Sequence, residues 1–202
     1  VDAPLRQHLH VGGDAINGNL LLMPAWQPGR HIGVKLVTVF PDNDQLGLPA
    51  VASVYTLFDG KTGAIVGQID GGELTARRTA AASVLAASFL ARTNSRNLVV
   101  MGTGRVSRNL AEAYCAIFAI DKVTLCSRSL EKAETLATEL GPIAPEIVTT
   151  TDFASAVSDA DIVSTATLAK TPIVLGELLR PGTHVDLVGS FRTDIREADD
   201  AV

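Results

Sequence analysis

A glycine-rich stretch at residues 102–104 has the residue types and spacing to bind a phosphate group. Gly102-Thr103-Gly104 follows an apolar run and precedes residues with the composition of a helix. Glycines leave the backbone bare, and amide groups at the start of a helix can hold the pyrophosphate of a dinucleotide. Such loops usually have a third small residue, which is Ser107 here. Serine still packs closely against a strand and can donate a hydrogen bond to phosphate.

The surroundings of this loop distinguish it from a plain turn between a strand and a helix. Gly-x-Gly alone is weak support for a nucleotide site. Here a strand is predicted at 98–102, a helix at 105–118 and a second strand at 122–126, which is the order of a dinucleotide-binding unit. We therefore predict a dinucleotide site whose loop residues are Gly102, Thr103, Gly104, Arg105 and Val106.

The residues after the second predicted strand indicate which dinucleotide is bound. An NAD site has a carboxylate there, whereas the 2′-phosphate of NADP requires cations and hydroxyl groups. This sequence has Ser127, Arg128 and Ser129, and Arg105 in the loop is a second cation. The pattern favours NADPH over NADH. The alternative is that Arg128 is only a solvated residue before the helix predicted at 130–140.

Two later groups of small and polar residues also follow predicted strands. Parallel strands end at the same edge of a sheet, and ligands bind at that edge. We expect the following residues to line the ribose and the nicotinamide of the cofactor: Thr165, Thr167, Val188, Gly189 and Ser190.

Hydrophobic periodicity predicts two domains that position these residues. Residues 93–202 form the dinucleotide-binding domain, an α/β fold with a Rossmann-type doubly wound parallel sheet. Its predicted strands are 98–102, 122–126, 146–150, 161–165 and 184–188, and its helices are 105–118, 130–140 and 153–158. Residues 1–92 form an α+β domain that supplies the substrate site. Its predicted strands are 19–26, 33–40, 51–59 and 64–68, mostly antiparallel, followed by an alanine-rich helix at 73–91.

Composition is that of an ordinary globular protein, with 47% hydrophobic and 19% charged residues among 202. A net charge of -5 provides no basic field for nucleic acid or an anionic membrane.

Cys115 and Cys126 fall in a predicted helix and strand, so we expect buried thiols in the cytoplasm rather than a disulfide or a metal site. The sequence opens at Val1 without methionine and stops at Val202 without an obvious final helix, and we expect a fragment of a longer polypeptide.

Several segments, in order along the chain, resemble the ornithine cyclodeaminase/μ-crystallin family. The most specific is LTARRTAA directly before a glycine-loop strand. The resemblance implies a homodimer. Each subunit has a Rossmann domain and a second domain for substrate binding and dimerisation, and a returning C-terminal segment completes this second domain. The similar segments are PLR (4–6), LLLMPAW (20–26), GVKLVT (33–38), LFDGKTG (57–63), LTARRTAAAS (74–83), MGTGRVS (101–107) and VDLVGSFRTDIREADD (185–200).

Three basic residues match family positions around an amino-acid-like substrate. By resemblance, Arg6 and Arg78 would hold the substrate carboxylate, and Lys35 would orient or protonate an imine nitrogen, with Lys35 and Arg78 as the catalytic residues. Arg78 and Thr79 would also contact the cofactor. Taken singly, residues such as Arg6 and Lys35 are more often surface charges than substrate contacts, although Lys35 interrupts an apolar strand and so needs a partner.

Departures from the family pattern separate this sequence from ornithine cyclodeaminases. The aspartate that transfers a proton in those enzymes aligns with Phe191, which has no proton to transfer. A lysine usual a few residues later aligns with Ile195, and a cofactor-contacting threonine aligns with Ala50. Asp194 is a poor substitute for the missing aspartate, because in related reductases it belongs to a turn.

The resemblance therefore implies NADPH-dependent reduction of small cyclic ketimine carboxylates, Δ1-pyrroline-2-carboxylate or Δ1-piperideine-2-carboxylate, to proline or pipecolate. Phe191 would then be an apolar wall that excludes water. Three alternatives stay open: an ornithine cyclodeaminase, an enzyme similar to alanine dehydrogenase, and a non-catalytic protein that binds a ligand in an NADPH-dependent way.

Overall fold

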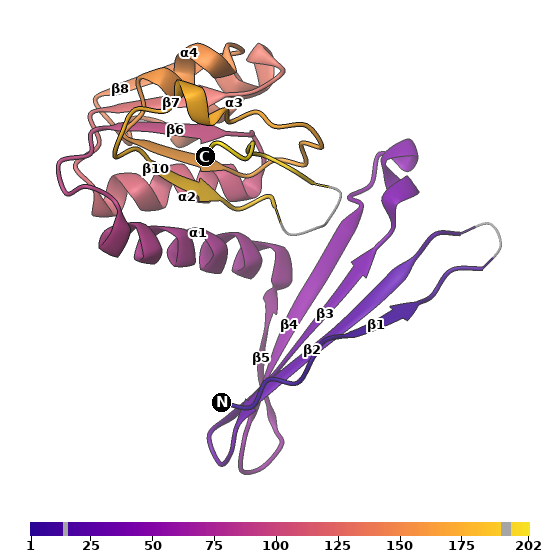
Figure 1. The fold of residues 1–202 in the computed structure, drawn as a ribbon. Coiled ribbons are helices and arrows are strands. Elements are labelled where there is room, and N and C mark those ends of the chain that lie inside the picture. Colours follow the sequence, from indigo (N-terminus) through magenta and orange to yellow (C-terminus); the bar gives the residue numbers. More distant parts are fainter. Residues whose placement is uncertain (14–15, 191–194) are drawn as a thin grey trace. The chain divides into compact units, whose positions relative to one another are not determined.

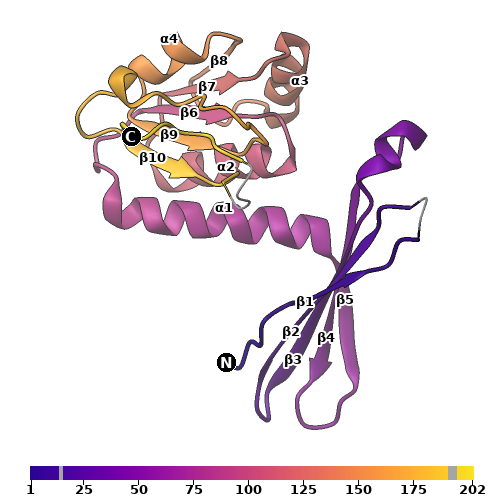
Figure 2. The same cartoon turned by 45° about the vertical axis from the view of Figure 1, so that its right-hand side comes forward.

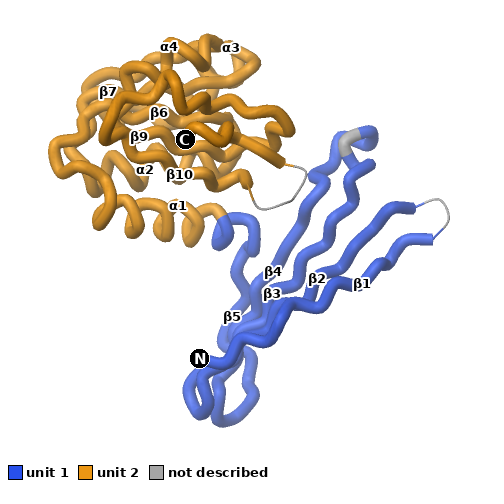
Figure 3. Tube along the Cα trace, viewed as in Figure 1, with its two compact units in different colours: residues 1–75 blue, residues 76–202 orange. Residues whose placement is uncertain are grey.

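The computed structural model describes residues 1–13, 16–190 and 195–202. Contacts within the chain divide it into two compact units, Val1–Thr75 and Ala76–Val202 (Figure 3). Each unit contains one five-stranded sheet, and each is described by itself. No helix within the described ranges is both long enough and apolar enough to cross a bilayer.

The first unit is an antiparallel sheet whose strands are neighbours in chain order (Figures 1 and 2). Gly29 and Gly63 form the turns after the second and fourth strands, with φ of +69° and +73°, values that glycine adopts without strain. The elements are β1 (Gln7–His10), β2 (Asn19–Gln27), β3 (His31–Val39), the 3-10 helix η1 (Pro41–Leu46), β4 (Val51–Asp59) and β5 (Ile65–Asp70).

This sheet has apolar side chains on both faces, because β2 and β3 are nearly continuous apolar runs rather than alternating ones. Among the described residues of the first unit, Val37 is the only buried large hydrophobic side chain. On β5, Ile65, Val66 and Ile69 are exposed. The sheet thus has more apolar surface than this unit covers by itself.

The second unit is a parallel sheet in the order β10-β9-β6-β7-β8 (Figure 2). Helices α1, α2 and α3 pack on one face through one apolar cluster, and α4 packs on the other face through a second cluster. The elements are α1 (Gly71–Leu90), β6 (Asn97–Met101), α2 (Arg105–Ile117), β7 (Lys122–Cys126), α3 (Leu130–Leu140), β8 (Glu146–Thr150), α4 (Phe153–Ser158), β9 (Ile162–Thr165), the 3-10 helix η2 (Gly176–Leu178) and β10 (His184–Leu187).

Helix α1 packs on the parallel sheet through small residues. Ala76, Ala80, Val84 and Ala87 recur every three or four residues and are buried, and the last three belong to the apolar cluster that includes residues of β6, β7 and β9. Their small size allows the helix to approach the sheet closely. For this reason the contact division falls after Thr75, and it differs from the predicted domain boundary between residues 92 and 93.

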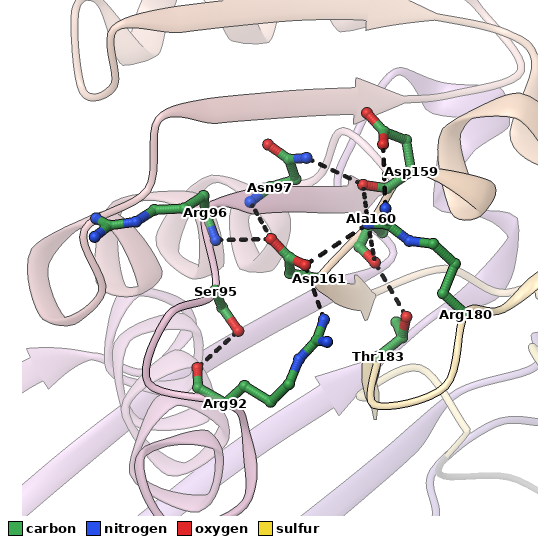
Figure 4. A network of polar contacts seen from close by, with 9 residues as sticks. All are labelled: Arg92, Ser95, Arg96, Asn97, Asp159, Ala160, Asp161, Arg180 and Thr183. Atoms are coloured by element: carbon green, nitrogen blue, oxygen red, sulfur yellow. Dashed lines mark hydrogen bonds and ion pairs between the residues drawn. The ribbon is translucent and has the colours of Figure 1, made fainter.

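Asp161 organises the edge of the parallel sheet at which the strands begin (Figure 4). Its carboxylate accepts from the backbone N–H groups of Arg96 and Asn97 at 2.8 and 3.0 Å and from the Arg92 guanidinium at 2.9 Å. Arg180 lies 3.6 Å away. Burial opposes ionisation of Asp161, but the amide hydrogen bonds and the charges of Arg92 and Arg180 outweigh it and lower its pKa below 3.8.

The predicted fold class is confirmed, with a parallel α/β sheet and the predicted alternation of strands and helices. Most predicted boundaries lie within two residues of the observed ones, because glycine, proline and charged residues mark the connections. Sequence analysis missed β1, a short exposed edge strand, and the two 3-10 helices η1 and η2. Such short elements carry little periodicity.

Both cysteines are free thiols, as expected. Cys126 is buried at the end of β7 and Cys115 is half-buried on α2. Burial raises the pKa of Cys115 to about 11. Burial, together with the charge of Asp152, raises the pKa of Cys126 to about 12.

Candidate dinucleotide site and substrate residues

The glycine loop between β6 and α2 has no room for a side chain at its first glycine. Gly102 has φ of +111°, a left-handed value that disfavours other residues. A Cβ placed there would lie 2.7 Å from the carbonyl oxygen of Ala166 and 2.9 Å from Ser107 Oγ. A Cβ at Gly104 would meet nothing within 4 Å, so Gly104 is open to an approaching ligand.

The first turn of α2 has free capacity to bind an anion. Helices α3 and α4 are capped by Ser129 and Asp152, which accept from backbone amides in the first turn. At the start of α2 the N-cap residue is Gly104, and no described side chain caps it. Ser107 Oγ is fully buried beside this loop and has no hydrogen-bond partner among the described residues. A close-packed glycine, uncapped amides and an unpartnered hydroxyl fit the pyrophosphate of a dinucleotide.

Ser127, Arg128 and Ser129 lie directly after β7, which pairs with β6 in the parallel sheet. Ser127 Oγ accepts from the N–H of Ser129 at 3.3 Å, and Ser129 Oγ accepts from the N–H of Lys132 at 3.3 Å. Each hydroxyl thus keeps its own hydrogen to donate. Arg128 is exposed, and its guanidinium can reach an anion in solvent. Two hydroxyl donors and a cation at this strand end suit a phosphate group.

The ends of β9 and β10 are joined by a buried carboxylate that sequence analysis missed, Glu197. Its Oε2 accepts from Thr165 Oγ1 at 2.7 Å and from the N–H of Gly189 at 2.8 Å. Its Oε1 accepts from the N–H and the hydroxyl of Thr167, at 2.7 and 2.6 Å. Glu197 is fully buried, and Ser190 Oγ lies 3.5 Å from it. Four of the five predicted contacts for ribose and nicotinamide therefore share one partner.

A second polar group with several partners, the half-buried Asp186 on β10, was also missed. It accepts from Ser83 on α1 at 3.2 Å, from Tyr114 on α2 at 3.2 Å and from Ser164 on β9 at 2.7 Å. Burial and the charge of Asp186 raise the pKa of Tyr114 well above 10. Both residues fall in the segment 185–200 that resembles the family, but neither was singled out there, because an acidic residue among polar neighbours gives no signal of burial.

Lys35 lies in the middle of β3, half-buried, in the first unit. Its ammonium group donates to Thr75 Oγ1, whose own hydroxyl donates to the carbonyl of Gly71 at 2.6 Å. Tyr55 faces Lys35 on the neighbouring strand β4. Lys35 thus has the partner that its place in an apolar strand led us to expect, and that partner, Thr75 on α1, is a contact that sequence analysis did not name.

The other predicted substrate and cofactor residues are exposed or half-exposed. Arg6 precedes β1 and is exposed, and Arg78 and Thr79 lie on α1 in the second unit, with Arg78 exposed. Their roles remain predictions. Phe191 and Asp194 lie outside the described residues. Ile195, which stands where cyclodeaminases have a lysine, is buried.

The comparisons with known proteins agree with this arrangement. The Ornithine cyclodeaminase/mu-crystallin family model matches residues 1–202. A Delta(1)-pyrroline-2-carboxylate reductase of Paracoccus denitrificans is 42% identical over 186 residues, covering 92% of this chain and 59% of the relative. The chain spans about three fifths of the length of the first curated relatives that it matches, 63% and 59%.

Two solved structures have the same fold. The Thermococcus litoralis Delta(1)-pyrroline-2-carboxylate reductase in complex with NADH and L-proline aligns with a TM-score of 0.85 at 33% identity, covering 98% of this chain and 62% of that one. An archaeal alanine dehydrogenase dimer with bound NAD aligns with a TM-score of 0.85 at 28% identity, covering 98% of this chain and 60% of that one. With the glycine loop, the strand ends and the whole-chain family match all in agreement, this chain belongs to the ornithine cyclodeaminase/mu-crystallin family.

Proposed function

We propose that this chain is part of an NADPH-dependent reductase of small cyclic ketimine carboxylates, with Δ1-pyrroline-2-carboxylate as the first candidate substrate. The observation that carries the proposal is the 42% identity to a Delta(1)-pyrroline-2-carboxylate reductase across 92% of the chain. The glycine loop adds a second argument, because its close-packed Gly102 and unpartnered Ser107 Oγ suit a dinucleotide.

Residues of the second unit would hold the cofactor. The amides at the start of α2 and the hydroxyl of Ser107 would bind the pyrophosphate, and Ser127, Arg128 and Ser129 would bind the 2′-phosphate. The preference for NADPH over NADH rests on this cation and its two hydroxyl groups, together with the lack of a carboxylate at residues 127–129. When bound, the nicotinamide supplies a hydride.

Lys35 would serve the substrate as a proton donor. The reduction of a C=N bond to an amine requires one hydride at carbon and one proton at nitrogen. A half-buried ammonium on a strand, hydrogen-bonded to Thr75, has the chemistry of a proton donor. A protonated imine is an iminium, whose carbon is a better hydride acceptor. Arg6 and Arg78 would neutralise the substrate carboxylate.

We further propose that the protein is a homodimer in the cytoplasm. The sheet of the first unit has apolar side chains on both faces, with few of them buried. Surfaces of this kind are typical of interfaces, and a second copy is the partner that we expect. One of the structural relatives is a dimer.

The test is an assay of the protein at its full natural length. We expect NADPH absorbance to fall on addition of Δ1-pyrroline-2-carboxylate, with slower oxidation of NADH. The Lys35→Ala variant should lose at least about 100-fold in kcat and should bind NADPH within about twofold of the wild type. Lys61→Ala, in the exposed β4–β5 turn, is the matched control and should keep full activity.

Other outcomes point to the competing functions. Release of ammonia from ornithine would identify a cyclodeaminase, and reduction of pyruvate in the presence of ammonia would identify an activity of the alanine dehydrogenase type. Tight NADPH binding without reduction of any imine would indicate a ligand-binding protein. Each of these results would replace the proposed reductase.

A further inference from the structure

Glu197 is a buried carboxylate with an unusual set of partners. It is fully buried, and its four short hydrogen bonds, 2.6 to 2.8 Å, come from the hydroxyls of Thr165 and Thr167 and the backbone amides of Thr167 and Gly189. A buried charge is costly unless hydrogen bonds satisfy it, and here every donor is a neutral group. The carboxylate therefore holds these donors in place relative to one another.

The groups that Glu197 holds lie at the carboxyl ends of the parallel strands, the same edge of the sheet at which the glycine loop follows β6. Thr165 ends β9 and Gly189 follows β10, and β9 pairs with β6, the strand that leads into the loop. The backbone between Thr165 and Thr167 approaches the loop directly, since the carbonyl oxygen of Ala166 is the nearest atom to a Cβ built on Gly102. A Cβ at Gly189 would clash with Thr167 and lie 2.5 Å from Glu197 Oε1, so this backbone fits tightly around the carboxylate.

The carboxylate also determines how the Thr167 hydroxyl can bond. Thr167 Oγ1 donates to Glu197 Oε1, so the hydroxyl hydrogen of Thr167 points toward the carboxylate. The remaining capacity of Thr167 Oγ1 is as an acceptor, and the N–H of Ala169 uses part of it at 3.3 Å. Thr167 is half-buried, and its oxygen can still accept from a ligand. On a nicotinamide nucleotide, the groups that can donate a hydrogen bond to this oxygen are the carboxamide NH2 group and the ribose hydroxyls.

We propose that Glu197 is a positioning residue for the nicotinamide half of the cofactor. It joins the ends of β9 and β10 and fixes the Thr167 hydroxyl as a hydrogen-bond acceptor for that half. The inference rests on the proposed function for the identity of the ligand. It assigns a role to a residue that itself has no contact with solvent.

The experiment compares two ligands on the full-length protein by equilibrium titration. NADPH has the nicotinamide half, and adenosine 2′,5′-bisphosphate lacks it. Thr167→Val removes the hydroxyl and keeps the backbone bond to Glu197. We expect this variant to bind NADPH about 10-fold more weakly and to change the affinity for adenosine 2′,5′-bisphosphate by less than about twofold. Thr167→Ser, which keeps a hydroxyl group, should restore NADPH binding.

Variants of Glu197 test the carboxylate itself. Glu197→Gln places an NH2 group among N–H and O–H donors, which then lack an acceptor. The loss of affinity for NADPH should exceed the loss for adenosine 2′,5′-bisphosphate by at least about 10-fold. Thr183→Val is the matched control, because it removes a hydroxyl that donates to the Ala160 carbonyl at 3.0 Å at the opposite edge of the sheet. It should leave both affinities unchanged. Thermal unfolding of each variant checks that it is folded.

The outcomes separate this inference from the proposed function. The positioning role would be overturned if Glu197→Gln lowered the affinity for both ligands equally. It would also be overturned if Thr167→Val left the affinity for NADPH unchanged. Selective loss of NADPH would support it even if the protein reduced no ketimine, a result that would overturn only the proposed substrate. If the wild type bound neither NADPH nor NADH, both proposals would fall.

Discussion

The hydroxyl of Tyr114 on α2 donates to Asp186 on β10 at 3.2 Å, which joins a helix to the edge strand of the parallel sheet. Ser83 on α1 donates to the other oxygen of the same carboxylate at 3.2 Å. Asp186 therefore connects the two helices that cover this part of the sheet. The same strand leads into Val188, Gly189 and Ser190, so the connection bears on the cofactor site.

Loss of the Asp186 carboxylate should destabilise the second unit. Asp186→Ala leaves the hydroxyls of Ser83, Tyr114 and Ser164 without their acceptor, and we expect the free energy of unfolding to fall by about 3 kcal/mol. Tyr114→Phe removes a single hydrogen bond and should cost about 1 kcal/mol. Urea denaturation of the full-length protein measures both. Equal losses for the two variants would show that Asp186 matters only through Tyr114.

A negative charge at position 128 should reverse the cofactor preference. Arg128→Asp places a carboxylate where Ser127 and Ser129 offer hydroxyl groups, and it should lower NADPH affinity at least about 10-fold more than NADH affinity. Titration with each cofactor measures the ratio, with Lys61→Asp in an exposed turn as the control for net charge. Equal losses for NADPH and NADH would remove the argument for a 2′-phosphate site.

The two loop glycines should behave differently when each is replaced by alanine. Gly102→Ala forces a Cβ to within 2.7 Å of the Ala166 carbonyl oxygen at φ of +111°, so we expect both a lower melting temperature and weak NADPH binding. Gly104→Ala meets no protein atom within 4 Å. It should unfold like the wild type and lose NADPH affinity, because its methyl group obstructs the approach of the phosphates. Unchanged binding by Gly104→Ala would place the pyrophosphate elsewhere.

Stability should decline in acid partly through Asp161. Its pKa is lowered in the folded chain, so its ionised form stabilises the protein above about pH 4, and this contribution is lost as the pH falls through the folded pKa. Wild-type protein should therefore lose stability more steeply below about pH 4 than Asp161→Asn. Denaturation midpoints across this pH range give the two slopes. Asp121→Asn, whose partner Arg96 lies 4.0 Å away in an exposed pair, should follow the wild type.

Sequence patterns were enough to predict the fold class, the order of elements in the second unit and the location of the glycine loop. These features depend on local patterns: strand-length apolar runs, helical spacing and glycines at turns. The loop prediction succeeded because Gly102, Gly104 and the first turn of α2 are adjacent in the chain, so one short window contains the whole arrangement. The serines and arginine after β7 were found for the same reason.

Tertiary structure alone decided which acidic residues matter. Glu197 lies 30 residues from Thr167 in sequence, and Asp186 lies 103 residues from Ser83 and 72 from Tyr114. Only the pairing of distant strands in the parallel sheet and the path of the chain after β10 bring these residues together, and no local pattern encodes that meeting. A carboxylate in a polar sequence is normally exposed. Glu197 is buried because the folded chain surrounds it with hydrogen-bond donors.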